Sequence, residues 1–192
     1  MQQAVAGECR PVVCESSDLL LGLVNTRPAV DGRPELLGDR AALARWLTDS
    51  GLGDGETLVT DADAAAAREL REAFVTIFRA HVGCTDGANA LPEAEAYLQR
   101  VAERYPLTPR ISAGGCTLVP AQTGVLGAFG SLLAAVADLA SRGAWLRLKM
   151  CKNDSCHAGF FDKTRNSSGL YCGTACGTQV SQRAYRSRLK NG

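Results

Sequence analysis

The chain has 192 residues, of which 46% are hydrophobic and 21% are charged, and its net charge is +1. This balance is typical of a soluble globular protein and excludes a disordered or collagen-like chain. No stretch approaches the ~18 to 20 apolar residues that a membrane span needs, and the apolar run over residues 19–24 lacks the basic flank of a signal peptide. We therefore expect a cytoplasmic protein with no membrane partner, in a compartment where thiols stay reduced.

Sequence periodicity predicts a mainly helical body. The first 16 residues show no clear periodicity, and we expect them to form a loosely docked arm. Five segments carry apolar residues at the three- and four-residue spacing of amphipathic helices. These segments are residues 18–26, 39–49 (with Asp39 as N-cap), 62–82, 93–104 and 124–141. Two β-type runs, residues 108–112 and 116–119, flank a pair of glycines and predict a hairpin. The expected fold is mainly α, an irregular helical bundle with a small β-hairpin.

Charge and composition change near residue 143. Residues 143–192 contain nine Lys or Arg and two acidic residues, a net charge of +7, whereas residues 1–142 contain 12 basic and 18 acidic residues, a net charge of −6. We therefore predict a helical domain over residues 1–142 and a separate basic module over residues 143–192. A basic segment attached to an acidic body favours an anionic partner for that segment. Attraction between the two parts is the alternative.

Four of the eight cysteines lie close together in the basic segment, at the spacing C-x4-C-x15-C-x3-C. They are Cys151, Cys156, Cys172 and Cys176. Two close pairs of thiolates match the tetrahedral four-cysteine sites of structural zinc, and they leave no open position for catalysis. An iron–sulfur cluster and a redox dithiol are the alternatives, but neither the ferredoxin spacings nor a C-x-x-C motif occurs. We therefore predict a zinc finger. His157 could replace one of the ligands, but the four cysteines make this unnecessary. No role is assigned to Cys9, Cys14, Cys84 or Cys116.

The segment after Cys176 can continue as a helix in which Arg183 and Arg186 share one face with Lys190. Arginine makes bidentate contacts to phosphate and guanine, and asparagine pairs with adenine. We therefore predict that Arg183 and Arg186, together with Arg165 and Asn166 from the loop between the cysteine pairs, contact DNA, mainly through its phosphates. The alternative is a basic helix that is merely solvated.

Motifs at both ends of the chain resemble one family. Near the N-terminus these are Leu23-Val24-Asn25-Thr26-Arg27, Asp31-Gly32-Arg33 and Glu35-Leu36-Leu37. Near the C-terminus they are Cys151, Cys156, Phe160, Asp162, Arg165, Asn166, Ser168, Cys172, Cys176 and Gly177. Together they resemble the bacterial CGNR zinc-finger family, whose N-terminal part is called the ABATE domain. The resemblance implies a zinc-bound finger and a transcription regulator that binds DNA through it.

The chain also departs from the family pattern. Thr178 and Gln179 replace the Asn and Arg of the naming motif, Tyr171 replaces a Trp, and Ser181 replaces a usual Lys. Relatives commonly carry arginines where this chain has Ser167, Gly169 and Leu170. Fewer basic residues imply weaker non-specific attraction to phosphate, because each neutralised phosphate adds to counterion release.

The helical body offers one candidate ligand site. Asn25, Arg27 and Arg33 are expected either to cap backbone groups or to line a pocket for a small polar effector. His81 is expected to be a hydrogen-bonded core residue. Because no catalytic motif stands out, the leading hypothesis is a DNA-binding regulator whose body senses a ligand or forms a homodimer. The alternative is a small-molecule enzyme or resistance protein in which the zinc module is purely structural.

Overall fold

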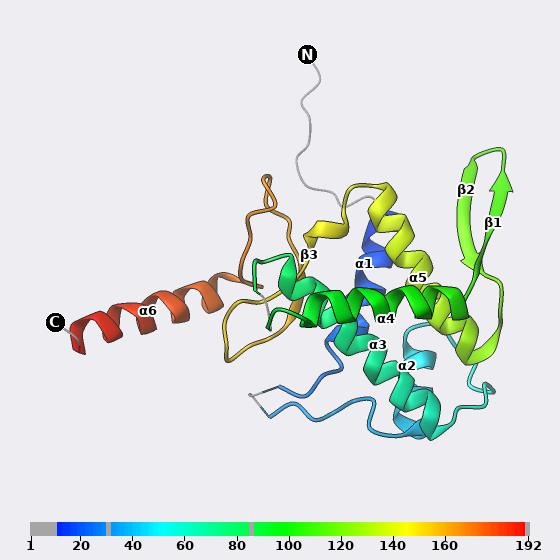
Figure 1. The fold of residues 1–192 in the computed structure, drawn as a ribbon, viewed down its shortest axis with the longest axis horizontal. Coiled ribbons are helices and arrows are strands. Elements are labelled where there is room, and N and C mark those ends of the chain that lie inside the picture. The colour runs from blue at the N-terminus through cyan, green and yellow to red at the C-terminus, as the bar shows by residue number, and fades with distance from the viewer. Residues whose placement is uncertain (1–10, 30–31, 85–86, 191–192) are drawn as a thin grey trace, which may run out of the picture.

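The computed structural model describes residues 11–29, 32–84 and 87–190, and side chains from residue 15 onward. The described chain is mainly helical, with two two-stranded sheets, which confirms the predicted fold class. Its helices are α1 (Pro11–Val24), α2 (Arg40–Asp49), α3 (Asp61–Ala80), α4 (Ala90–Arg104), α5 (Gly124–Ser141) and α6 (Thr174–Lys190). Figure 1 shows α1 to α5 gathered in one bundle, while α6 runs away from it, at the opposite end from the hairpin.

The first helix begins earlier than its periodicity predicted. Helix α1 starts at Pro11, so the predicted loose arm is wrong for residues 11–16, and residues 1–10 lie outside the described residues. Proline suits a first helical turn, because the N–H that it lacks would have no partner there. Ser16 lies inside the helix and donates to Asp138 Oδ2 of α5 at 2.9 Å. Polar residues on this helix therefore pack against a second helix.

Local capping signals fix two of the helix starts. Asp39 caps α2 as predicted, and its carboxylate accepts a hydrogen bond from the Ala42 N–H at 2.8 Å. Thr60 and Asp63 form a reciprocal capping box at the start of α3, which satisfies backbone donors that have no partner within the helix. Helix α3 then packs between its neighbours and buries Phe74 and Phe78 in the centre of the bundle.

Helix α5 is long and apolar enough, by length and composition alone, to cross a membrane. The expectation that no stretch approaches this length was therefore wrong. Part of its apolar surface nevertheless packs in the core, where Phe129, Leu132 and Leu139 are buried. That burial is typical of a central helix in a soluble protein and supplies no evidence for a membrane span.

The predicted hairpin is confirmed and is slightly longer than expected. Strand β1 (Leu107–Ser112) pairs antiparallel with β2 (Gly115–Pro120), and Ser112 lies opposite Gly115 at the turn. The end of the hairpin presses against α5, where a Cβ at Gly130 would lie 3.0 Å from the Pro120 Cβ. The rest of the hairpin is exposed, including Ile111.

A second small sheet joins the C-terminal segment to the bundle, and it was not predicted. A short 3-10 helix, η1 (Trp145–Arg147), leads into β3 (Leu148–Met150), which pairs antiparallel with β4 (Gly159–Phe161). Leu148 and Met150 are buried in the same apolar core as Phe78. The core thus extends past residue 143, and the division into a domain over residues 1–142 and a basic module over residues 143–192 stays a prediction.

Candidate metal centre and the projecting helix

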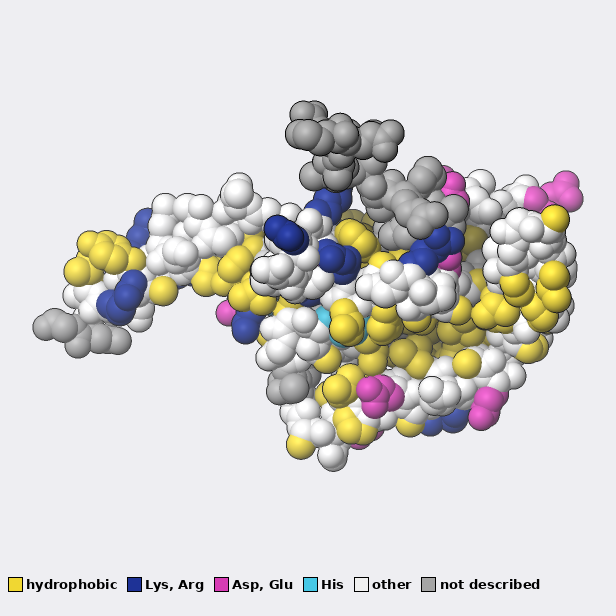
Figure 2. Space-filling model, turned by 90° about the horizontal axis from the view of Figure 1, so that it is seen from above, with side chains coloured by type: hydrophobic (Ala, Val, Ile, Leu, Met, Phe, Trp, Pro, Cys, Tyr) yellow, Lys and Arg dark blue, Asp and Glu magenta, His cyan; other side chains and the backbone are white. Residues whose placement is uncertain are grey.

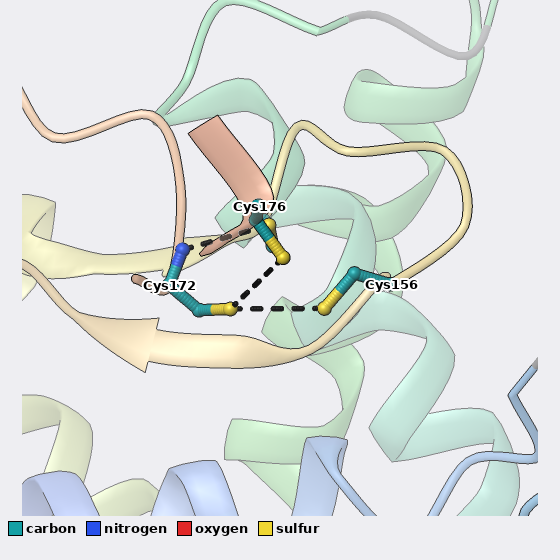
Figure 3. A group of neighbouring side chains, drawn as sticks. Cys156, Cys172 and Cys176 are labelled. Atoms are coloured by element: carbon teal, nitrogen blue, oxygen red, sulfur yellow. Dashed lines mark hydrogen bonds between the residues drawn. The ribbon is translucent and has the colours of Figure 1, made fainter. Parts of the chain in front are cut away.

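The four clustered cysteines meet at the junction of β3 and α6. Cys151 directly follows β3, Cys156 lies on the next turn, and Cys172 and Cys176 flank the start of α6. All four Sγ atoms lie within 4.8 Å of one another. Figure 3 shows dashed lines from the Cys172 sulfur to the sulfurs of Cys156 and Cys176. Both of these sulfur–sulfur distances are 3.7 Å. A tetrahedron with Zn–S bonds of about 2.3 Å has edges of about 3.8 Å, so the sulfurs fit such an ion.

The first cysteine pair sits on a tight turn. The Cys151 N–H donates to the Ala158 carbonyl at 2.8 Å, and the Cys156 N–H donates to the Asn153 carbonyl at 2.8 Å. His157 has a φ of +52°, a left-handed conformation that reverses the chain after Cys156. His157 does not belong to the four-sulfur group, so the substitute ligand is not needed.

The surroundings of the sulfurs set how readily each thiol loses its proton. Burial raises the pKa of Cys151, and partial desolvation together with hydrogen bonds to the Cys156 and Cys176 thiols raises the pKa of Cys172. A hydrogen bond with the Asn153 side chain lowers the pKa of Cys176. A metal ion bound as a thiolate complex must therefore displace protons that Cys151 and Cys172 hold more tightly than a free thiol does.

Asn153 connects the first cysteine turn to α6 and was missed by the sequence reasoning. It is fully buried, and its Nδ2 donates to Gln179 Oε1 at 3.0 Å. Its Oδ1 accepts hydrogen bonds from Arg183 Nη1 at 3.2 Å and from the Ser155 hydroxyl at 3.0 Å. Gln179, a departure from the family motif, thus helps to dock α6. The only local signal was the Asn-x-Ser sequence, which is typical of an Asx turn.

A buried ion pair organises the loop between the cysteine pairs. Lys149 Nζ lies 2.7 Å from Asp162 Oδ2 and also donates to the Ser167 and Gly169 carbonyls. Burial alone would raise the pKa of Asp162, but hydrogen bonds from Lys149 and Thr164 outweigh it and hold that pKa well below its usual range. A Cβ at Gly169 would lie 2.7 Å from Asp162 Oδ1, so this position requires glycine.

The predicted nucleic-acid contacts fall on two separate segments. Arg165 and Asn166 are exposed on the loop that Asp162 holds. Arg183 and Arg186 share one face of α6, as predicted from their spacing. The Arg183 guanidinium also donates to Ser155 Oγ at 3.0 Å, which ties it to the first cysteine turn. Arg186 is exposed and forms no hydrogen bond or ion pair with the described residues.

Two family models match the chain. The ABATE model, described as "Putative stress-induced transcription regulator", matches residues 17–143, and the CGNR zinc finger model matches residues 147–189. The chain belongs to the ABATE family. Its C-terminal module is a CGNR zinc finger, so the resemblance seen at both ends of the sequence is confirmed. A search of curated proteins returned no match.

The predicted ligand residues of the ABATE region lie apart. Both polar atoms of the Asn25 side-chain amide bind the finger. Its Oδ1 accepts from the Gly159 N–H at 2.7 Å, and its Nδ2 donates to the Gly159 carbonyl at 3.2 Å. Arg27 pairs with Glu72 at 3.3 Å and borders a cavity of about 20 Å³ that neither Asn25 nor Arg33 lines. Arg33 lies half-buried in the loop after α1. Their role in ligand binding stays a prediction.

Proposed function

We propose that this ABATE protein is a cytoplasmic, DNA-binding transcription regulator whose CGNR finger is folded around Zn²⁺. Four sulfurs within 4.8 Å of one another suit this ion and leave no position for substrate, so the metal's role is structural. Cys151, Cys156, Cys172 and Cys176 would hold it. When bound, the ion ties the first cysteine turn to the start of α6 and so fixes the direction of that helix.

The observation that carries this proposal is the projecting basic helix. None of the residues of α6 is fully buried, and the helix extends beyond the body into solvent. Figure 2 shows basic side chains on α6 and beside it, whereas acidic side chains lie mainly on the body. A single helix fits the major groove of DNA, which is about 12 Å wide. DNA phosphates would also repel the acidic body, so the charge pattern would orient the protein with α6 toward the duplex.

The residues divide into contacts and supports. Arg186 and Lys190 lie on one face of the free part of α6 and would neutralise phosphates. Arg165 and Asn166 would add contacts from the neighbouring loop. Arg183 would contact phosphate while its hydrogen bonds to Asn153 and Ser155 keep α6 in position. The description of the ABATE model as a putative transcription regulator supports the regulatory role of the whole chain.

A salt titration of binding to random duplex DNA tests the proposal. The wild-type protein should bind with a log–log salt slope of several units, and Arg186→Ala should lower the slope by about one unit. Arg183→Ala with Arg186→Ala should lower it by about two units and leave the zinc content unchanged. Arg110→Ala, an exposed change on β1, is the matched control and should leave the slope unaltered.

The contrary result is equally clear. If the wild-type protein ignores DNA at low salt, or if Arg186→Ala and Arg110→Ala behave alike, α6 is not a DNA-binding element. The finger would then be purely structural, and the alternative of a small-molecule enzyme or resistance protein would stand.

A further inference from the structure

A cleft of about 560 Å³ lies between the ABATE region and the CGNR finger. Helices α3 and α4 form one wall through Ile77 and Leu91, and η1 contributes Leu146. Lys149 and Ser167 of the finger line the other side. The volume falls in the range of about 300 to 1,000 Å³ that is usual for small-molecule sites. We propose that this cleft binds a neutral aromatic molecule that carries a hydrogen-bond donor, and that its occupancy regulates the finger.

The apolar walls favour an aromatic body. Trp145 packs edge-on against Phe78 and His81, with ring centroids 5.5 and 5.4 Å apart, so two neighbouring rings support the indole. Leu146, next along the chain, is 63% exposed beside it. The exposed Leu146 side chain and the neighbouring Trp145 indole together form an apolar surface that a flat apolar molecule would cover.

His81 supplies the polar group of the cleft. Its Nδ1 lies 2.7 Å from the Leu148 carbonyl oxygen, which can only accept, so Nδ1 carries the proton. Burial lowers the pKa of His81, which keeps the ring neutral and leaves Nε2 as an acceptor. Nε2 has no hydrogen-bond partner among the described residues. A hydroxyl or ring N–H on the ligand would satisfy it.

The charged groups at the cleft argue against an anionic ligand. All three protons of the Lys149 ammonium are engaged by Asp162 and by the Ser167 and Gly169 carbonyls. The ammonium therefore has no donor left for a carboxylate or phosphate. Glu95, exposed on α4, adds a negative charge at the same cleft.

The position of Ser167 connects the cleft to the finger. Ser167 has a φ of +50°, a conformation that non-glycine residues rarely adopt, and its carbonyl is held by Lys149. It directly follows Arg165 and Asn166. A ligand that touches Ser167 would thus favour one arrangement of this loop over another, and the affinity for DNA would change with it. This regulatory part rests on the proposed function.

Binding is tested on the full chain by two-dimensional NMR, without DNA. The probe is 1-naphthol, and the signal is the indole N–H of Trp145, identified by its persistence in a Trp46→Phe variant. We expect this signal to shift on titration. The methyl ether of 1-naphthol, which cannot donate to His81, should bind about tenfold more weakly, because it would cover the Nε2 acceptor without pairing it.

A pair of leucine variants locates the site. Leu146→Asp should weaken 1-naphthol binding by about tenfold or more, since the ligand would have to cover a charge. Leu58→Asp is the matched control, because Leu58 is 92% exposed and does not line the cleft. Both residues are exposed, so neither change should unfold the protein. An unmoved Trp145 signal at saturating probe, or equal effects of the two variants, would overturn the ligand site.

Regulation is tested by measuring DNA affinity at fixed salt with and without saturating 1-naphthol. We expect a change of about fivefold or more, with DNA altering the affinity for 1-naphthol by the same factor, as linkage requires. A bound probe with unchanged DNA affinity would overturn the regulatory role and leave the ligand site standing. Absence of DNA binding would instead overturn the proposed function. The NMR titration contains no DNA, so its outcome does not depend on that result.

Discussion

The ABATE region and the CGNR finger are stabilised by different means. The helical body buries many large apolar side chains, among them Phe74, Phe129 and Leu132. Beyond Met150, the fully buried residues in the described chain are Cys151, Asn153, Gly159 and Asp162, none of which is a large hydrocarbon. The finger beyond β3 therefore relies on its sulfurs, one buried ion pair, and hydrogen bonds of both backbone and side chains such as Asn153. This contrast indicates that metal and polar contacts decide the stability of the finger, whereas packing decides that of the body.

The largest effect should come from breaking the sulfur cluster. Replacing Cys156 by Ser, or any other of the four ligands, should abolish zinc binding and unfold the finger while α1 to α5 persist, because the body does not need the metal. Elemental analysis should show about one zinc per wild-type chain and almost none in the variant. Cys116→Ser, an exposed change on the hairpin, is the control. Visible absorbance typical of an iron–sulfur cluster in the wild-type protein would contradict the assignment.

The next effect concerns the buried ion pair. Asp162→Ala leaves the Lys149 ammonium buried without a counter-ion, and we expect the free energy of unfolding to fall by about 3 to 5 kcal/mol. The exposed pair of Arg142 with Asp138 on α5 provides the comparison, since Arg142→Ala should cost at most about 1 kcal/mol. Urea denaturation of the zinc-loaded proteins measures both. Equal losses would show that the pair at Lys149 is effectively solvated.

A smaller effect is expected at the contact between the two regions. Asn25→Ala removes both hydrogen bonds to Gly159 and should lower the free energy of unfolding by about 1 to 3 kcal/mol. Amide hydrogen exchange should become faster at β4, while the centre of α5 should be unaffected. Thr76→Ala, which removes a single hydrogen bond within α3, is a milder reference. Unchanged exchange at β4 would mean that apolar packing alone docks the finger.

The smallest effect is a pH dependence carried by His81. Its pKa is lowered in the folded protein, mainly by burial, so the unfolded chain binds a proton more readily. The stability that the neutral ring provides is complete above the unfolded pKa of about 6.5 and is lost as pH falls below it. Unfolding free energies should therefore fall less steeply between pH 7.5 and 5.5 in His81→Gln than in the wild type. Loss of zinc at low pH affects both proteins, so parallel curves would refute this role.

What could be predicted from sequence was local. The Asp39 cap, the hairpin around its glycine pair and the grouping of four cysteines all follow from residues close together in the chain. Contacts between distant residues gave no such signal. Asn25 meets Gly159, 134 residues away, and Asn153 meets Arg183, 30 residues away. Each depends on the path of β3 and β4, whose three-residue strands are too short to show periodicity.

Strand β3 leaves the apolar core and leads directly into Cys151. This connection limits how closely two copies of the protein could bind along DNA. No flexible tether separates the finger from the body, because Leu148 and Met150 are packed beneath the helices only a few residues before the metal centre. If the finger binds DNA as proposed, it cannot swing toward the duplex alone, and the whole body must follow it. Neighbouring recognition sites would then have to be spaced by the width of the helical bundle rather than by that of the finger.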